Sequence, residues 1–316
     1  MIEVDHITRT YGEFVAVDGV SFVISPGEVV GLLGHNGAGK TTVMKMMTGF
    51  LEPTGGRVCV DGLDVAHNRR EIQRRIGYLP ENCPIYPDMT VIDYLDYVLA
   101  LRGMDESERL PLVAETIDRT GLREKATEPI ATLSRGYRQR TGVAQAILGG
   151  PKLLILDEPT NGLDPTQIKQ MRSLIAELAN QSTIIISTHI LQEVQAVCDR
   201  VIILKDGKKA LDARLDDLQQ GNRLLLSIDS AEDRALPVLH NLPGFSSAKP
   251  TSSEVHLPGS CRYVLTLSKD GSRTEAAATV ARVVQQQGWQ LYSLHYETRT
   301  LETVFAEISA HRGGVA

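Results

Sequence analysis

A chain of 316 residues, 42% hydrophobic and 23% charged, is long enough to bury globular cores, and about 100–200 residues per domain predicts two domains. This composition argues against a disordered chain. The formal net charge of -6 gives no basic surface for neutralising a phosphate backbone, so we expect no nucleic-acid partner.

The cysteines and the apolar runs bear on where the protein works. The 4 cysteines are scattered without CxxC spacing, so we expect neither a zinc site nor a disulfide scaffold, and a reducing cytosol suits them. No run approaches the roughly 18 apolar residues of a membrane-spanning helix, and the start lacks the apolar segment of a secretory signal. Any membrane role is therefore expected to act through a partner.

The first element with a chemical signal is the apolar run Val29–Leu33, which predicts a buried strand. A glycine-rich loop of the form GxxxxGK[ST] follows it, and a helix-competent run over Thr42–Thr48 comes next. The loop consists of Gly34, His35, Asn36, Gly37, Ala38, Gly39, Lys40 and Thr41. Its glycines let backbone N–H groups turn inward onto phosphate oxygens, Lys40 reaches the β- and γ-phosphates, and the Thr41 hydroxyl ligates Mg²⁺. The pattern predicts a cradle for a nucleoside triphosphate.

The next stretch, from Pro80 to about Gly150, changes to helical periodicity of its apolar residues. We therefore expect a mainly helical subdomain over about residues 82–150, inserted into the nucleotide-binding domain. Its hinge is expected at the proline cluster formed by Pro80, Pro84 and Pro87.

Within that subdomain, Ser134 and Gly136 open a predicted helix over Tyr137–Leu148. A serine at this place caps the helix, and the free N–H groups and the positive end of the helix dipole favour an anion. The pattern indicates a second anion site, far along the chain from Lys40.

The buried strand predicted at Leu153–Leu156 ends in two adjacent carboxylates, at the edge where open α/β sheets bind ligands. Asp157 is expected to hold Mg²⁺ and Glu158 to orient and deprotonate the attacking water. The common alternative is that these two acids only cap a loop. The phosphate-binding loop upstream makes this alternative less favoured. Another apolar strand, Thr183–Ser187, is followed by His189, and a histidine at a strand end is often structural.

After Asp217 the pattern predicts a separate α+β module over residues 221–316, for which a split βαβ arrangement is one form. Its expected strands are Arg223–Asp229, Tyr263–Ser268 and Trp289–Tyr296, and its expected helices are Thr274–Gln287 and Leu301–Ala310. The predicted fold class is therefore α/β, with a P-loop NTPase core over residues 1–217, its helical subdomain and a small C-terminal α+β domain. The module carries no motif for chemistry, so we expect a regulatory or dimer-bracing role.

These motifs, with Leu133–Tyr137, Gly162–Asp164 and Thr188–His189, resemble those of ATP-binding-cassette (ABC) ATPase subunits from Met1 to about Asp217. In that family a Walker A loop, a lid-loop glutamine, the LSGGQ signature, Walker B, a D-loop and a switch histidine occur in this order. The resemblance implies ATP and Mg²⁺ as cofactors and a head-to-tail homodimer, in which the signature contacts the γ-phosphate of ATP held by the second copy.

The resemblance also distributes roles among the residues. ATP contacts are implied for Tyr11, Gly34, His35, Asn36, Gly37, Ala38, Gly39, Lys40, Thr41, Thr42, Ser134, Gly136 and Asp164. Catalytic roles fall to Glu158, His189 and Lys40, and metal binding falls to Thr41, Glu81 and Asp157. Tyr11 would stack on adenine and His189 would report the γ-phosphate. Asp164 would meet the opposing P-loop, although Pro165 after it also fits a plain helix N-cap.

Two positions depart from the family pattern. The signature reads LSRGY, which keeps Ser134 and Gly136 but loses the first glycine and the glutamine. The lid loop carries Glu81 where many relatives have glutamine, and an ionised carboxylate ligates Mg²⁺ but cannot donate a hydrogen bond to water.

GYLPE with LSRGYRQR resembles the exporter-type subgroup associated with multidrug, polysaccharide, gliding-motility and copper-enzyme-maturation permeases. Leu301–Phe305 is similar to the LEDVF segment that often ends that subgroup, and an ordinary amphipathic helix is the alternative. The predicted function is the ATP-hydrolysing subunit of a transporter at the cytoplasmic face of the membrane, with integral-membrane permease subunits as partners. A soluble cassette protein serving translation or DNA repair is the second hypothesis.

Overall fold

The structure, a computed structural model, describes residues 1–251, 260–268, 273–298 and 300–310. It divides into two compact units, one formed by Met1–Leu215 together with the residues from Phe305 onward, the other by Asp216–Val304. The sequence had assigned the last helix to the C-terminal module. From Phe305 this helix groups with the first unit instead, because its side chains contact the glycine-rich loop.

The first unit is built on a mostly parallel six-stranded sheet. In spatial order its strands are β10 (Lys208–Arg214), β9 (Arg200–Lys205), β3 (Val29–Leu33), β8 (Thr183–Thr188), β7 (Leu153–Asp157) and β6 (Ile76–Leu79). Only β10 runs antiparallel to its neighbour. Every residue of β3, β7 and β8 is buried, which is why these strands read as continuous apolar runs. β3 has the predicted bounds, and β7 and β8 each extend one residue further.

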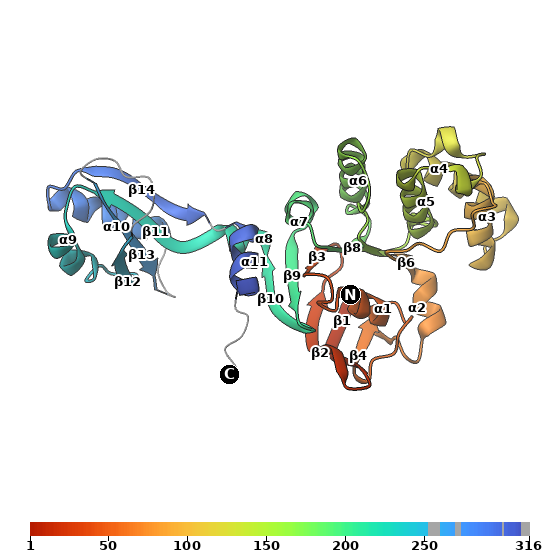
Figure 1. Ribbon diagram of the computed structural model, residues 1–316, viewed down its shortest axis with the longest axis horizontal. Helices are drawn as coiled ribbons and strands as arrows, with labels where there is room; N and C mark the ends of the chain where they lie inside the picture. The colour runs from red at the N-terminus through yellow and green to blue at the C-terminus, as the bar shows by residue number, and fades with distance from the viewer. Residues whose placement is uncertain (252–259, 269–272, 299, 311–316) are drawn as a thin grey trace. The chain divides into compact units, whose positions relative to one another are not determined.

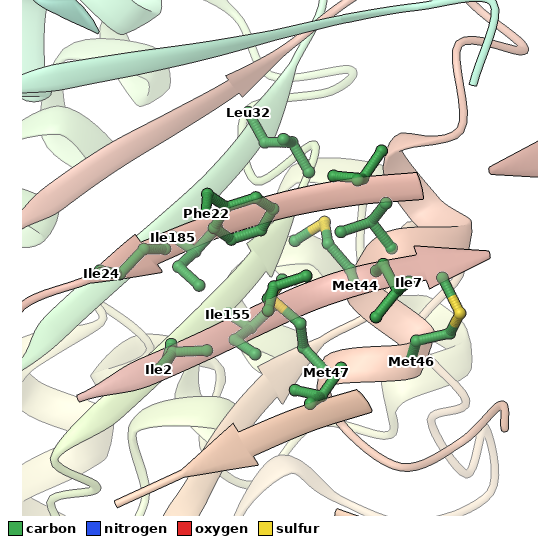
Figure 2. Close-up of a cluster of buried hydrophobic side chains, with 14 of the residues drawn as sticks. Ile2, Ile7, Phe22, Ile24, Leu32, Met44, Met46, Met47, Ile155 and Ile185 are labelled. Carbon is green, nitrogen blue, oxygen red and sulfur yellow. The ribbon is translucent and has the colours of Figure 1, made fainter. Parts of the chain in front are cut away.

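A second, antiparallel sheet packs against the first. Its order is β2 (Phe14–Ile24), β1 (Ile2–Tyr11), β4 (Gly55–Val60) and β5 (Leu63–Asp64). Helix α1 (Lys40–Met47), which follows the glycine-rich loop, contributes buried methionines to the core shared with both sheets. Figure 2 shows Met44 and Met46 near Ile7 of β1, and Met47 near Ile155 of β7. This core anchors α1 through its C-terminal half.

Helices α5 (Arg135–Ile147), α6 (Pro165–Leu178) and α7 (Leu191–Val197) cover the other face of the parallel sheet (Figure 1). Helix α2 (Arg69–Arg75) instead buries Ile72 in the core shared by the two sheets. The expected helical region consists of α3 (Val91–Leu101), α4 (Glu106–Arg119) and α5, with short 3-10 turns at Arg123–Lys125 and Ile130–Thr132. Helices α3, α4 and α5 enclose a core of their own around Tyr94, Leu95 and Leu148. The Thr90 hydroxyl starts α3 by accepting a hydrogen bond from the Asp93 N–H.

The second unit is an antiparallel sheet with its own core. Its elements are α8 (Leu215–Gln219), β11 (Gln220–Ile228), α9 (Glu232–Leu239), β12 (Phe245–Pro250), β13 (Cys261–Leu267), α10 (Arg273–Gln286) and β14 (Leu291–Thr298), and α11 (Leu301–Ala310) follows. The strand order β12-β13-β11-β14, with a helix after β11 and another after β13, is a split βαβ arrangement. Among the described residues, no helix is both long and apolar enough to cross a membrane.

Candidate nucleotide site

The glycine-rich loop runs from the end of β3 into α1, and its backbone requires glycine at particular positions. Gly37 and Gly39 have φ angles of 83° and 100°, in the left-handed region that side chains disfavour. A Cβ atom at Gly34 would lie 2.5 Å from the carbonyl oxygen of Leu204 in β9. The loop is therefore tightly wound and pressed against the neighbouring strand, as a cradle of inward-facing N–H groups requires.

Lys40 is the cation of this cradle. Its side chain is only 7% exposed, and its ammonium donates hydrogen bonds to the carbonyl oxygens of Gly34, at 2.7 Å, and His35, at 3.3 Å. Burial lowers the pKa of Lys40, and the negative charges of Glu158 and Asp157 oppose that shift. A buried ammonium held by neutral carbonyl groups gains more from anionic phosphate oxygens.

Thr41 and Asp157 meet at the mouth of the cradle. The Thr41 hydroxyl donates a hydrogen bond of 3.0 Å to Asp157 Oδ2, whereas Asp157 Oδ1 is buried without a hydrogen-bond partner. Asp157 is 1% exposed, and burial raises its pKa. A buried carboxylate oxygen left without a partner, beside a hydroxyl, fits a hard cation that takes oxygen ligands, as Mg²⁺ does.

Glu158 follows Asp157 but has a different environment. Its φ of 49° is unusual for a residue with a side chain, and such conformations occur preferentially at functional sites. Both carboxylate oxygens lie within hydrogen-bonding distance of His189 Nδ1, at 2.9 and 3.0 Å. Burial raises the pKa of Glu158, and the hydrogen bond from His189 opposes that shift. The structure thus pairs the predicted base with the predicted switch histidine.

The signature and D-loop residues begin two helices. Ser134 caps α5 by accepting a hydrogen bond of 3.4 Å from the Tyr137 N–H, and Asp164 caps α6 in a capping box with Gln167. The Asp164 carboxylate therefore has the plain N-cap role that the sequence left open. A Cβ atom at Gly136 would lie 2.3 Å from the Gln167 side-chain oxygen, so a larger residue there would displace the Gln167 side chain from its capping box.

Glu81 and Tyr11 lie at the periphery. Glu81 is exposed, yet its charge acts on the pKa of both Lys40 and Asp157, so it lies within electrostatic reach of the cradle. Tyr11 is 48% exposed and the Arg9 guanidinium lies 4.7 Å from its ring centroid. Because the Tyr11 ring already contacts this guanidinium, its stacking on adenine stays a prediction. Thr42 follows Thr41 in the first turn of α1.

A cavity of about 470 Å³ adjoins Glu81. Its lining includes Thr41, Lys45, Phe50, Tyr78, Glu81 and Gln145. It therefore extends from Thr41 at the mouth of the cradle to Gln145 of the helical subdomain.

The sequence analysis missed several residues of the site. Arg135, which replaces the first signature glycine, donates a hydrogen bond of 3.1 Å to Asn161, and its side chain lies against Gly162 of the D-loop. The Gln139 side chain donates to the backbone oxygen of Glu158 at 3.3 Å. Since these contacts join positions distant in the chain, no local spacing in one sequence could have revealed them.

A buried glutamate was also missed. Glu193 is 3% exposed and accepts hydrogen bonds from the hydroxyls of Thr160 and Thr188, the latter at 2.8 Å. Thr160 follows the β7 end and Thr188 precedes His189, so this network ties together the two loops that carry the paired Glu158 and His189. The only signal in the sequence was a glutamate on the apolar helix pattern after His189.

Known proteins resemble this chain in sequence. Residues 17–161 match the family model described as ABC transporter. The chain is 34% identical over 259 residues to the uncharacterised ABC transporter ATP-binding protein YhaQ of Bacillus subtilis (strain 168), covering 81% of this chain and 85% of YhaQ. It is 37% identical over 241 residues to the bacitracin transport ATP-binding protein BcrA of Bacillus licheniformis, covering 76% and 78% of the two chains.

Solved structures of ABC ATP-binding subunits have a similar fold. One, the ATP-binding subunit of an ABC transporter, superposes with a TM-score of 0.64 at 30% identity and covers 69% of this chain and 92% of its own. Another, the ATP-binding cassette MJ0796 in a dimeric post-hydrolysis state bound to ADP and Pi, gives a TM-score of 0.64 at 26% identity, with coverage of 68% and 99%.

Proposed function

The chain belongs to the family of ABC transporter ATP-binding proteins, and we propose that its cradle hydrolyses Mg²⁺-bound ATP in composite sites shared by two copies of the chain. ATP binding and hydrolysis are properties of the family. The soluble translation or repair alternative is not favoured, because relatives such as BcrA are named as transport proteins. The assignment of each step to residues is the proposal.

The pair formed by Glu158 and His189, beside the cradle, carries the proposal. Glu158 accepts a proton from the attacking water, and His189 holds its carboxylate in one orientation and stabilises its charge. Lys40 binds the β- and γ-phosphate oxygens as charge develops on them. Glu81, Thr41 and Asp157 would hold Mg²⁺, which when bound neutralises phosphate charge.

A second copy completes each site in this proposal. The N-terminus of α5, with Ser134 and Gly136, would contact the γ-phosphate held by the partner copy, while Asp164 would approach the partner's P-loop. Dimeric MJ0796 bound to ADP and Pi supports an association of this kind. ATP would then join the two copies, and hydrolysis would release them.

Integral-membrane permease subunits are the proposed partners, at the cytoplasmic face of the membrane. The cavity beside Glu81 supports a docking place, because it contacts the metal-binding edge through Thr41 and the helical subdomain through Gln145. Cys83 adjoins this region, but its thiol is half-buried near the Gln145 side-chain oxygen at 3.3 Å, and burial raises its pKa to about 12. It is therefore a poor site for crosslinking a partner.

Glu158→Gln tests the proposal. This variant should bind ATP like the wild type, hydrolyse it about 10²- to 10⁴-fold more slowly, and accumulate as a dimer with ATP and Mg²⁺. Equilibrium binding, phosphate release and analytical ultracentrifugation measure the three properties. Lys40→Ala is the matched control and should lose ATP binding itself. Wild-type turnover by Glu158→Gln would remove Glu158 from the mechanism, and a monomer under these conditions would contradict the composite site.

A further inference from the structure

The last described helix reaches the glycine-rich loop. The Phe305 ring of α11 lies 4.8 Å from the His35 ring, between centroids, with an interplanar angle of 48°. One turn further along α11, the Ser309 hydroxyl shares a hydrogen bond of 3.0 Å with His35 Nε2. Phe305 and Ser309 belong to the same compact unit as His35. Helix α11 therefore contacts the exposed His35 side chain through two groups, the Phe305 ring and the Ser309 hydroxyl.

A second contact fixes the same end of α11. The Lys205 ammonium donates a hydrogen bond of 2.6 Å to the carbonyl oxygen of Ile308, where a helix has carbonyl groups without internal partners and favours a cation. Lys205 ends β9, and in the turn after it the Gly207 N–H donates to the carbonyl oxygen of Ala38, at 3.3 Å. The end of α11 is thus attached both to the loop and to the turn that supports the loop.

His35 connects this helix to the catalytic lysine. Its side chain contacts α11, while its carbonyl oxygen accepts hydrogen bonds from the Lys40 ammonium, at 3.3 Å, and from the Ala38 N–H, at 3.1 Å. A change in the backbone at His35 would therefore move an acceptor of Lys40 and an N–H group inside the cradle. The GxxxxGK[ST] pattern leaves the residue type at position 35 unspecified, so the motif gives the His35 side chain no role of its own.

We propose that His35 is a positioning residue, which Phe305 and Ser309 hold in place so that the loop around Lys40 is preorganised for ATP. The inference rests on the nucleotide site proposed above and adds the C-terminal helix to its control. A loop that is already ordered loses less conformational freedom on binding phosphate. An aromatic pair and a hydrogen bond each contribute about two- to tenfold to an equilibrium constant.

The test compares His35→Ala, Phe305→Ala and the double variant in the full-length protein, by isothermal titration with ATP and by steady-state kinetics. Each single variant should weaken ATP binding about three- to tenfold and raise KM by about the same factor, with a larger effect on KM than on kcat because Glu158 and His189 are outside the contact. The double variant should bind ATP no more weakly than His35→Ala, since that single variant already removes both the ring contact with Phe305 and the hydrogen bond with Ser309. Phe305→Tyr, which keeps the ring, should restore binding.

Controls separate positioning from folding. Ala306→Ser, a change at an exposed position of α11, should have no effect on ATP binding. If Phe305→Ala lowers the Tm, Ser309→Ala replaces it in the test, because it removes only the hydrogen bond to His35 and should still weaken ATP binding. Unchanged or tighter ATP binding in the single variants, additive losses in the double variant, or a fall in kcat at unchanged KM would each overturn the proposal. Wild-type ATP binding by Lys40→Ala would instead show that the nucleotide site was misassigned.

Discussion

Asp157 and Glu158 are adjacent carboxylates whose surroundings separate their chemistry. Asp157 faces the Thr41 hydroxyl and keeps one oxygen without a partner, whereas both oxygens of Glu158 lie against the His189 ring. The left-handed backbone at Glu158, φ 49°, turns the chain between them. Burial raises the pKa of both groups, so each is poised for a partner that compensates its charge: a cation for Asp157, and His189 for Glu158.

Glu81 gives a prediction at this scale. If its carboxylate helps to hold Mg²⁺, Glu81→Gln should raise the Mg²⁺ concentration for half-maximal ATPase activity about two- to fivefold, a modest effect because the side chain is exposed. ATP binding without Mg²⁺ should stay unchanged, since the glycine-rich loop holds the phosphates. Activity measured over a Mg²⁺ titration checks this, with the exposed Glu106→Gln in α4 as the control. If Glu81→Gln and the control reach half-maximal activity at the same Mg²⁺ concentration, Glu81 does not bind the metal.

Among the elements, the β9–β10 ribbon supports the loop and is itself held by one arginine. The Arg200 guanidinium contacts Asp212 across the ribbon with two hydrogen bonds, of 2.7 and 3.0 Å, and donates a third to the carbonyl oxygen of Val23 in β2, at 2.9 Å. The ribbon is thereby joined to the antiparallel sheet. Because its turn backs the loop and carries Lys205, its stability bears on the whole cradle.

This ion pair makes stability depend on pH. Burial raises the pKa of Asp212, but the hydrogen bonds and charge of Arg200 outweigh it and leave the pKa lowered. An aspartate with a lowered folded pKa stabilises the protein above its unfolded pKa of about 3.9, and that contribution is lost as the pH falls through the folded value. Asp212→Asn should therefore reduce the free energy of unfolding by about 1–3 kcal/mol at pH 7 and by less at pH 3. Urea unfolding at both pH values checks this, with the exposed Glu13→Gln as the control, and an equal loss at both would contradict it.

Sequence and structure agree where local patterns suffice. The buried strands β3, β7 and β8 were predicted to within one residue, because parallel strands covered on both faces read as unbroken apolar runs. The antiparallel sheet was missed, since β1 and β2 alternate buried and exposed residues with register shifts that break the alternation. Helix α9 was missed as well, because it has only eight residues and contains Pro237.

In the candidate site, the glycine-rich loop and the acidic strand end predicted Lys40, Thr41, Asp157 and Glu158, and the structure brings these residues together. Spacing in the sequence could not reveal Arg135 on Asn161 or Phe305 on His35, because those partners are 26 and 270 residues apart and meet only in the folded chain. Motifs report positions that contact a shared ligand, whereas contacts between motifs depend on packing.

At the scale of the whole molecule, the division into two units predicts what the C-terminal module contributes. All proposed phosphate, metal and signature positions lie in Met1–Leu215, so a chain ending at Asp217 should keep a chemically complete site. The sequence alone predicts little loss of ATP affinity for such a chain. The contacts of α11 with His35 change that expectation, because the truncation also removes Phe305 and Ser309.

Two truncations separate the effects of helix and module. A chain ending at Thr298 lacks α11 but retains β11–β14, and a chain ending at Asp217 lacks both. Both should bind ATP about three- to tenfold more weakly than the full chain, as is expected for Phe305→Ala, because each loses the contacts of Phe305 and Ser309 with His35. If the module braces the dimer, only the shorter chain should dimerise more weakly in a Glu158→Gln background with ATP and Mg²⁺. Titration calorimetry and sedimentation measure the two effects on one set of proteins. Complete loss of ATP binding by a folded chain ending at Asp217 would place part of the site in the module, and equal dimerisation of the two truncated chains would leave the module without a bracing role.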